Sequence, residues 1–257
     1  MKRGNYAIHA AIWGLGGRSR SSEIEFYSIL AKKYGNKVLS LMCATGEIAY
    51  GMTENGLRVT AVDIEPEMIA AAKKNNPGNT NPCFLTGDVT DLHLPDKDYS
   101  FAFIGTGDFH HLLSENEMLE ALICIHKHLT DKGCLTLELF YPGSESWQSP
   151  KRRFELPNPP ETGLIMWKLS EASYNADTMR EYIKQEVFLE EQGRTESFLH
   201  EFELQLVSRE TLVGLLEKAG FEIAAEYGGF DFDVWHPGAD KWIVESVKVN
   251  YKANDNE

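Results

Sequence analysis

The sequence predicts an α/β fold, with a doubly wound, mostly parallel sheet of seven strands, helices on both faces and an inserted antiparallel sheet. The first observation is that apolar runs of strand length alternate with helical patterns up to residue 141, which is typical of a parallel sheet covered on both sides. The second is that the pattern changes after Pro142, where extended stretches are separated by turn-forming residues. A chain of 257 residues with 42% hydrophobic composition can bury one sizeable core, so we expect a single domain over 1–257.

The first predicted element is a helix over 21–34, where apolar residues recur at helical spacing after a pair of serines that can cap it. Further along, Pro66 suits a first helical position, and Ser114 with Glu117 forms a capping box. The apolar runs predict strands over 37–42, 57–63, 83–85, 99–104 and 134–141, with helices from about residue 46, over 66–74 and over 115–129.

The second half of the chain begins with three extended stretches between residues 164 and 208, separated by the turn formers 175–177 and 192–194. A helix over 208–218, closed by Gly220, and strands over 221–227 and 241–249 follow. We therefore expect residues 143–207 to form an inserted antiparallel subdomain that covers a substrate, and residues 1–36 to form an N-terminal lid and helix.

Charge and cysteine content narrow the class of protein. A formal net charge of -14 without a long basic run is the opposite of what a general phosphate-backbone binder needs, so we expect no nucleic-acid partner. The sequence contains no uninterrupted run of 18 apolar residues, so we expect no membrane span. Four well-separated cysteines without a CxxC pattern favour free thiols and a cytoplasmic location over disulfides or a zinc site. A homo-oligomer is compatible with the sequence.

The stretch "VLSLMCATGEIAYGM", residues 38–52, reads as a buried strand, a turn of small residues and a helix. In an open α/β sheet, ligands bind at the carboxyl ends of the strands, near the point where the strand order reverses. Small residues let a ligand touch the backbone there, and the start of the helix offers free N–H groups. This turn is therefore the predicted ligand site.

Two carboxylates agree with that location. Asp63 ends the next strand in "VTAVDIEPEMIAAAKKN", 17 residues after Gly46, where a carboxylate can accept both hydroxyls of a ribose. Asp88 follows the third strand in "LTGDVTD" and could meet an adenine amino group. The alternative for both is a turn-forming role.

In this order and spacing, the motifs resemble those of class I S-adenosylmethionine-dependent methyltransferases, whose first motif runs roughly V-L-D-L-G-C-G-T-G. The resemblance covers most of the chain, through "DFHHLLSENEMLEALICIHKHLTDKGCLTLELFYPG" and "LVGLLEKAGFEIAAEYGGF". The N-terminal "GGRSRSSEIEFYSILAKKYG", the late insertion and "FHHLL" look most like the small-molecule branch, which includes aminosugar N-methyltransferases. The resemblance implies one methyltransferase domain of Rossmann-like fold, with S-adenosylmethionine as cofactor and a small-molecule methyl acceptor.

The same resemblance implies the residues of the cofactor site. Ala44 and Gly46 would lie against the methionine part, Asp63 with Ile64 would hold the ribose, and Asp88 with Val89 would border the adenine. The other residues that we expect in this site are Met42, Cys43, Met68 and Gly105, together with Arg20 (or Arg18) of the N-terminal lid, which would reach the cofactor carboxylate.

The first motif departs from the family pattern. Ser40 stands where an acidic residue is usual, and Met42 and Ala44 replace the first two glycines. Ala44 tolerates close backbone approach less well than glycine, and Met42 adds bulk. These departures motivate an alternative function, a catalytically weak or inactive cofactor-binding partner protein.

Methyl transfer is an in-line displacement whose rate depends largely on orientation, and an amine acceptor must also lose a proton. His110 and His111 follow the fourth strand, and imidazole can accept a proton near neutral pH, so they are the catalytic candidates. His111 aligns with a histidine common in the branch that the chain resembles. By residue type alone, Asp108, His110 and His111 could also form a metal site. The predicted fold gives a metal no function there, so we expect none.

Four residues are candidates for contact with the acceptor. Trp167 and His200 lie in the insertion, and Trp235 and His236 lie in the aromatic turn 228–238. The alternatives are a half-buried sheet face and a stiff hairpin turn. The function that the sequence predicts is methyl transfer from S-adenosylmethionine to N or O of a small metabolite. A protein or RNA methyltransferase is the alternative that keeps the fold.

Overall fold

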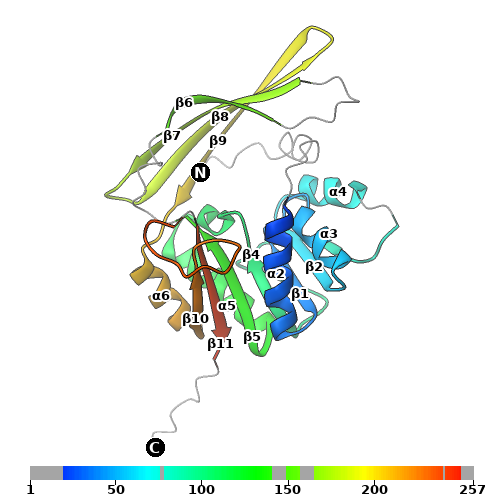
Figure 1. The fold of residues 1–257 in the computed structure, drawn as a ribbon, viewed down its shortest axis with the longest axis vertical. Coiled ribbons are helices and arrows are strands. Elements are labelled where there is room, and N and C mark those ends of the chain that lie inside the picture. Colours follow the sequence, from blue (N-terminus) through cyan, green and yellow to red (C-terminus); the bar gives the residue numbers. More distant parts are fainter. Residues whose placement is uncertain (1–19, 76–77, 141–148, 157–164, 240, 250–257) are drawn as a thin grey trace, which may run out of the picture.

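The computed structural model describes residues 20–75, 78–140, 149–156, 165–239 and 241–249. These residues form a seven-stranded sheet and a separate four-stranded antiparallel sheet (Figure 1). The predicted fold class, a mostly parallel sheet with an added antiparallel sheet, is confirmed. Of the predicted N-terminal lid, only the part from Arg20 onward lies within the described residues, so Arg18 lies outside them.

The seven-stranded sheet has the order β10-β11-β5-β4-β1-β2-β3, and β11 is antiparallel to both of its neighbours while the other pairs are parallel. Strand order reverses between β1 and β4, the point at which open α/β sheets bind ligands outside the carboxyl ends of their strands. The strands are β1 (Lys37–Leu41), β2 (Arg58–Asp63), β3 (Cys83–Thr86), β4 (Tyr99–Ile104), β5 (Leu129–Leu139), β10 (Phe221–Tyr227) and β11 (Trp242–Lys248).

Helices cover both faces of this sheet, and each face has its own apolar core. Buried side chains of α2 (Ser21–Tyr34), α3 (Glu47–Glu54) and α4 (Pro66–Asn75) belong to one cluster. Those of α5 (Glu115–His128) and α6 (Arg209–Lys218) belong to the other. The sheet between these two layers is therefore shielded from water, which leaves its carboxyl edge as the place where side chains can meet a ligand.

The second sheet has the order β6-β7-β8-β9 and lies across the carboxyl edge of the first (Figure 1). Its strands are β6 (Ser149–Glu155), β7 (Ile165–Asn175), β8 (Arg180–Glu191) and β9 (Arg194–Gln205). We call it the lid sheet. Three of its strands match the predicted stretches. β6 was not predicted, because "SPKRRFE" is charged, begins beside a proline and lacks apolar alternation.

The other element boundaries follow the predictions closely, with one clear exception. β5 begins at Leu129 and not at Cys134, because the polar residues 130–133, which read as a loop, are drawn into the strand. Ser114 caps α5 as expected, since its side chain accepts a hydrogen bond from the Glu117 N–H at 3.2 Å.

All four cysteines are free thiols; Cys134 is buried, and Cys83 is exposed. Among the described helices, none combines the length and the apolar character that a membrane span requires.

Candidate active site

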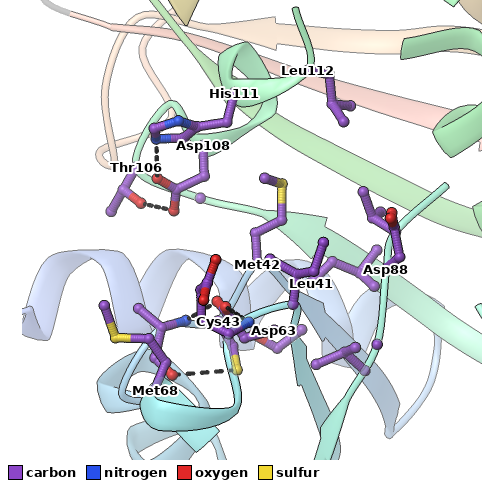
Figure 2. Close-up of a pocket in the computed structure, with 18 of the residues that line it drawn as sticks. Leu41, Met42, Cys43, Asp63, Met68, Asp88, Thr106, Asp108, His111 and Leu112 are labelled. Atoms are coloured by element: carbon purple, nitrogen blue, oxygen red, sulfur yellow. Dashed lines mark hydrogen bonds and ion pairs between the residues drawn. The ribbon is translucent and has the colours of Figure 1, made fainter. Parts of the chain in front are cut away.

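A cavity of about 430 Å³ lies at the carboxyl ends of β1, β2 and β4, between the parallel sheet and the lid sheet (Figure 2). Twelve of the predicted site residues line it. They are Arg20, Met42, Cys43, Ala44, Asp63, Ile64, Met68, Asp88, Val89, Gly105, His111 and His200. The strand order thus brings together residues that are up to 180 positions apart in the chain, from Arg20 to His200.

The turn between β1 and α3 has a left-handed backbone at three positions. Met42 has φ 52°, Ala44 has φ 48° and Gly46, the residue before α3, has φ 80°. Non-glycine residues seldom adopt this region, and such strained positions concentrate at ligand sites. A Cβ atom at Gly46 would lie 2.5 Å from the Phe84 ring, so glycine is required there. Gly46 supports this turn from behind and does not itself line the cavity.

Asp63 ties this turn to the end of β2. Its Oδ2 accepts a hydrogen bond from the Ala44 N–H at 2.8 Å, and its Oδ1 accepts one from the Glu65 N–H at 3.0 Å. Burial raises the pKa of the carboxyl, and these two backbone donors oppose the rise. Because each carboxylate oxygen can accept a second hydrogen bond, Asp63 can hold the turn and still meet a ligand.

Asp88 combines a turn role with a place in the cavity wall. Its Oδ1 accepts hydrogen bonds from the Thr90 N–H at 2.9 Å and from the Thr90 hydroxyl at 2.7 Å. The predicted turn-forming alternative therefore holds for this oxygen. The side chain still lines the cavity, beside Val89.

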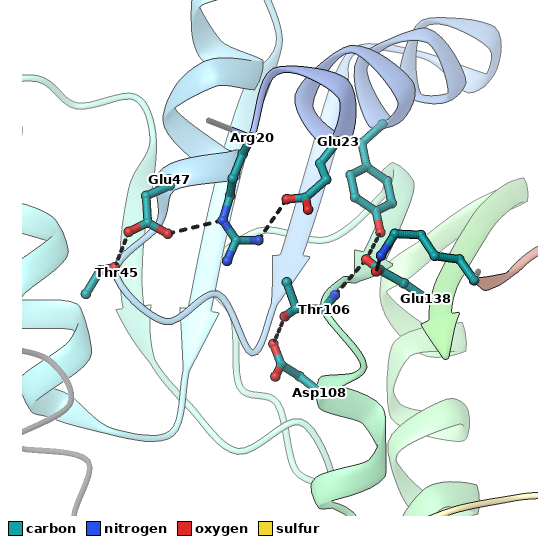
Figure 3. Close-up of polar contacts among 9 residues, drawn as sticks. Arg20, Glu23, Thr45, Glu47, Thr106, Asp108 and Glu138 are labelled. Carbon is teal, nitrogen blue, oxygen red and sulfur yellow. Dashed lines mark hydrogen bonds and ion pairs between the residues drawn. The ribbon is translucent and has the colours of Figure 1, made fainter. Parts of the chain in front are cut away.

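Arg20 immediately precedes α2, where two carboxylates hold its guanidinium group (Figure 3). Nη1 donates to Glu23 at 2.8 Å, and Nε lies 3.7 Å from Glu47. Glu47 in turn accepts a hydrogen bond from the Thr45 hydroxyl at 2.9 Å. Arg20 is thus a preoriented cation at the edge of the cavity, where an anionic ligand group could displace one of its partners.

The structure contradicts the catalytic role predicted for His110. The ring is fully buried, Nδ1 is 2.8 Å from the Gln205 carbonyl, and Nε2 accepts a hydrogen bond from the Phe140 N–H at 3.0 Å. Burial lowers its pKa to about 4. Because backbone groups occupy both nitrogens, His110 is a structural residue that joins β9 to the end of β5, and it can neither take a proton from an acceptor nor bind a metal in this arrangement.

His111 does line the cavity, next to Asp108 (Figure 2). Its Nε2 lies 4.0 Å from Asp108 Oδ1, which is too long for a hydrogen bond. Burial lowers the pKa of His111 to about 4, so the imidazole is neutral at pH 7 and the pair is not an ion pair. Among the described residues, no group of three His, Cys, Asp or Glu side chains has an arrangement that could hold a metal ion.

A buried carboxylate supports the loop that carries Asp108. Glu138 of β5 accepts hydrogen bonds from the Thr106 N–H at 2.8 Å, the Tyr27 hydroxyl at 3.2 Å and the Lys241 ammonium at 2.5 Å. The Thr106 hydroxyl donates to Asp108 (Figure 3). This chain of contacts fixes the end of β4 against β5 and β11.

The lid sheet supplies the opposite wall of the cavity. Lys168 of β7, Gln185 of β8 and three residues of β9, His200, Phe202 and Glu203, line it. The ring of Phe202 lies 5.4 Å from that of His111 and 4.9 Å from that of His200. Burial, with smaller contributions from His111 and Lys168, lowers the pKa of His200 to about 4.

The other predicted acceptor residues lie away from the cavity. Trp167 precedes Lys168 on β7, so it points to the opposite face of the lid sheet, where it stacks on Phe188 at 5.2 Å. Trp235 packs on Trp242 at 5.7 Å. His236 is exposed in a turn whose Gly238 N–H donates to its ring. The alternatives given above, a sheet face and a hairpin turn, describe these three residues.

Some cavity residues were not predicted. Asp108 was considered only as a metal ligand, although its place four residues after the end of β4 could have indicated the cavity. For Lys168, Gln185, Phe202 and Glu203, the alternation of the lid strands leaves two faces to choose between, and the sequence carries no signal that selects one.

The strand order, the cavity at the β1/β4 switch point and the acidic residue that ends β2 define the fold of class I S-adenosylmethionine-dependent methyltransferases. Residues 38–133 match a family model described as a methyltransferase domain. This match covers 96 of the 257 residues and agrees with the predicted resemblance to methyltransferases.

Known proteins agree with this assignment. "Putative methyltransferase YqeM" of Bacillus subtilis (strain 168) is 25% identical over 103 residues, which cover 40% of this chain and 42% of that protein. The chain thus matches less than half the length of this curated relative. The sugar N-methyltransferase KedS8 of Streptoalloteichus has a TM-score of 0.76 and 16% identity, with 97% of this chain and 95% of that chain covered.

CalS10, an amino pentose methyltransferase of Micromonospora echinaspora solved with S-adenosylmethionine bound, has a TM-score of 0.73 and 17% identity, over 94% of this chain and 97% of that chain. At such identities these two structures show a shared fold.

Proposed function

We propose that the chain transfers the methyl group of S-adenosylmethionine to a nitrogen or oxygen atom of a small metabolite. The observation that carries this proposal is the cavity itself, which has a strained small-residue turn and carboxylates on one wall and the lid sheet on the other. Its volume of about 430 Å³ lies in the range of roughly 300–1,000 Å³ in which proteins bind small ligands.

The cavity wall suits each part of the cofactor in turn. In this proposal Arg20 meets the carboxylate, Ala44 and Gly105 border the methionine part, and Asp63 with Ile64 holds the ribose. Asp88 and Val89 border the adenine, and the buried Met68 packs beneath it. The fit rests on two features, the backbone that comes close to the cavity at Ala44 and the second acceptor site left on each Asp63 oxygen.

The cofactor supplies an electrophilic methyl group on a sulfonium that leaves as a neutral thioether. The chain's own residues have three tasks, to orient the acceptor, exclude water and handle the acceptor proton. His111 suits the first task, because a neutral imidazole in the cavity can accept a hydrogen bond from the acceptor. Lys168, Phe202 and His200 of the lid sheet cover the acceptor from the opposite side.

The enclosure by the lid sheet favours a small acceptor over an extended peptide or nucleic acid. The structural neighbours CalS10 and KedS8, an amino pentose methyltransferase and a sugar N-methyltransferase, support the same choice. Met42 and Ala44, the departures from the first motif, line the cavity and leave about 430 Å³ of space in it. This space supports a bound cofactor over a partner protein without one.

Calorimetric titration with S-adenosylmethionine and S-adenosylhomocysteine tests the cofactor half of this proposal. We expect dissociation constants near micromolar, about -8 kcal/mol, and a loss of at least tenfold in Asp63→Asn. Asp91→Asn is the matched control, because the Asp91 side chain is 80% exposed and lies outside this cavity. Wild-type protein that binds neither compound would contradict the proposal. An acceptor screen of amines and hydroxyl compounds, read by formation of S-adenosylhomocysteine, then tests turnover.

A further inference from the structure

Asp108 lies in the cavity wall with its Oδ1 4.0 Å from His111 Nε2, and the proposed cofactor contacts do not use it. It opens the 3-10 helix η1 (Asp108–His111), four residues after the end of β4 at Ile104. Figure 2 shows Asp108 and His111 pointing toward each other on the side of the cavity opposite Cys43 and Met68. The carboxylate thus stands with His111, where the acceptor is expected.

The backbone before Asp108 is held in an uncommon shape. Thr106 has φ 57° and Gly107 has φ 77°, and a Cβ atom at Gly107 would lie 2.5 Å from the Phe140 ring. In this shape the Thr106 N–H donates to Glu138 and the Thr106 hydroxyl donates to Asp108 Oδ2. Oδ1 faces His111 at 4.0 Å. One oxygen is therefore anchored while the other remains on the cavity side, an arrangement that positions a carboxylate without saturating it.

The surroundings of Asp108 are mostly acidic. The ionisable groups that face it are Asp63 at the end of β2, Cys43 in the β1–α3 turn, Tyr27 of α2, Glu138 of β5, His111 of η1 and Arg20 before α2. Burial raises the pKa of Asp108 to about 7, the Thr106 hydrogen bond opposes the rise, and Asp63 and Glu138 add to it. A cation bound against Asp108 would relieve this repulsion.

We propose that Asp108 binds the acceptor as an ammonium ion and takes its proton, so that the acceptor of this enzyme is an amine. This inference rests on the proposed methyltransferase function and adds the class of acceptor and the residue that selects it. Asp108 combines a cavity-side oxygen with a place beside His111.

The ammonium passes one proton to the Asp108 carboxylate, which becomes a neutral acid, and leaves an amine with a free lone pair. That lone pair forms the N–C bond to the methyl group while the S–C electron pair remains on sulfur as a neutral thioether. The methylated product carries the positive charge that the sulfonium gave up, and Asp108 releases its proton to water. A hydroxyl acceptor is far too weak an acid to make the first transfer to a carboxylate.

Sinefungin provides a probe that needs no acceptor, because it is a cofactor analogue with an aminated carbon in place of the methylated sulfur. Its extra ammonium group occupies the region of the transferred methyl, whereas S-adenosylhomocysteine has no group there. The measured quantity is the ratio of the two dissociation constants, determined by calorimetry for wild type, Asp108→Asn and the exposed control Asp91→Asn. Asparagine keeps the shape of Asp108 and an oxygen for the Thr106 hydroxyl.

We expect wild type and Asp91→Asn to bind sinefungin at least tenfold more tightly than S-adenosylhomocysteine. In Asp108→Asn the ratio should fall to about one, with S-adenosylhomocysteine affinity within threefold of wild type. In wild type, the preference for sinefungin over S-adenosylhomocysteine should also grow as the pH rises from 6 to 8. Over this range the Asp108 carboxyl ionises while the extra ammonium group of sinefungin stays charged. Asp108→Asn should lose this pH dependence.

Three results would overturn the inference and leave the methyltransferase proposal standing. One is a wild-type ratio near one, and another is a ratio that Asp108→Asn does not change. The third is an equal loss of affinity for both compounds in Asp108→Asn. That result would mean that Asp108 contacts the α-ammonium group that the two compounds share. Wild-type protein that binds neither compound would instead contradict the methyltransferase proposal itself.

Discussion

The two walls of the cavity are built on different principles. The cofactor wall is made of residues at the ends of parallel strands, where hydrogen bonds of the sheet and of Asp63 fix the backbone. The lid wall is made of side chains from the middle of antiparallel strands, so the face that each residue takes depends on strand register. The first wall is therefore sensitive to backbone geometry, and the second to the identity and face of single side chains.

The largest expected effect is on the cofactor wall, in Gly46→Ala. Alanine at φ 80° is strained, and its Cβ would lie 2.5 Å from the Phe84 ring. The turn must therefore shift, and we expect a loss of at least 100-fold in S-adenosylhomocysteine affinity and roughly 2–4 kcal/mol in unfolding free energy. Calorimetry and denaturant unfolding measure the two quantities.

Gly193→Ala is the matched control for backbone strain. Gly193 lies in the β8–β9 turn with φ 78°, and a Cβ there would meet nothing within 4 Å. We expect Gly193→Ala to lower the free energy of unfolding by about 1 kcal/mol and to leave cofactor affinity unchanged. Equal cofactor affinities in the two glycine variants would show that the β1–α3 turn does not depend on its backbone shape.

The lid wall is tested by two aromatic residues on opposite faces of one sheet, Phe202 and Trp167. Phe202→Ala removes a cavity side chain, so kcat/KM for the acceptor should fall roughly 10- to 100-fold, about 1.4–2.8 kcal/mol, while S-adenosylhomocysteine affinity stays within threefold. Trp167→Ala removes a stack with Phe188 on the outer face and should leave kcat/KM within about threefold. The steady-state kinetics of both variants provide the measurement. A larger loss of kcat/KM in Trp167→Ala than in Phe202→Ala would reverse the assigned faces of the lid sheet.

The same contrast between the two walls explains which site residues could be predicted from the sequence. Asp63, Asp88 and Ala44 could be placed because the end of a parallel strand has one location, the carboxyl edge, whatever the register of its neighbours. Trp167 and Lys168 are adjacent, and only the pairing of β7 with β8 decides which of them faces the cavity. The sequence also could not separate His110 from His111, because the hydrogen bonds to Phe140 and Gln205 come from residues 30 and 95 positions away.

The smallest difference that we expect to resolve is between these two neighbouring histidines. His110→Ala leaves the Phe140 N–H without its acceptor and removes the contact to Gln205, so the free energy of unfolding should fall by roughly 2–3 kcal/mol at pH 7.5. His111→Ala should lower the free energy of unfolding by less than about 1 kcal/mol. It should nevertheless lower kcat, because the His111 ring lines the cavity. Denaturant unfolding and steady-state kinetics give the two readouts.

The pH dependence of His110→Ala sharpens this comparison. The pKa of His110 is about 4 in the folded chain, against an ordinary value of 6.5, so its stabilising contribution is complete above pH 6.5 and is lost as the pH falls toward 4. The stability gap between wild type and His110→Ala should therefore narrow by about 2 kcal/mol from pH 7.5 to pH 5. A gap that stayed constant over this range would mean that His110 is not held neutral by its buried backbone partners, and would restore it as a candidate catalytic residue.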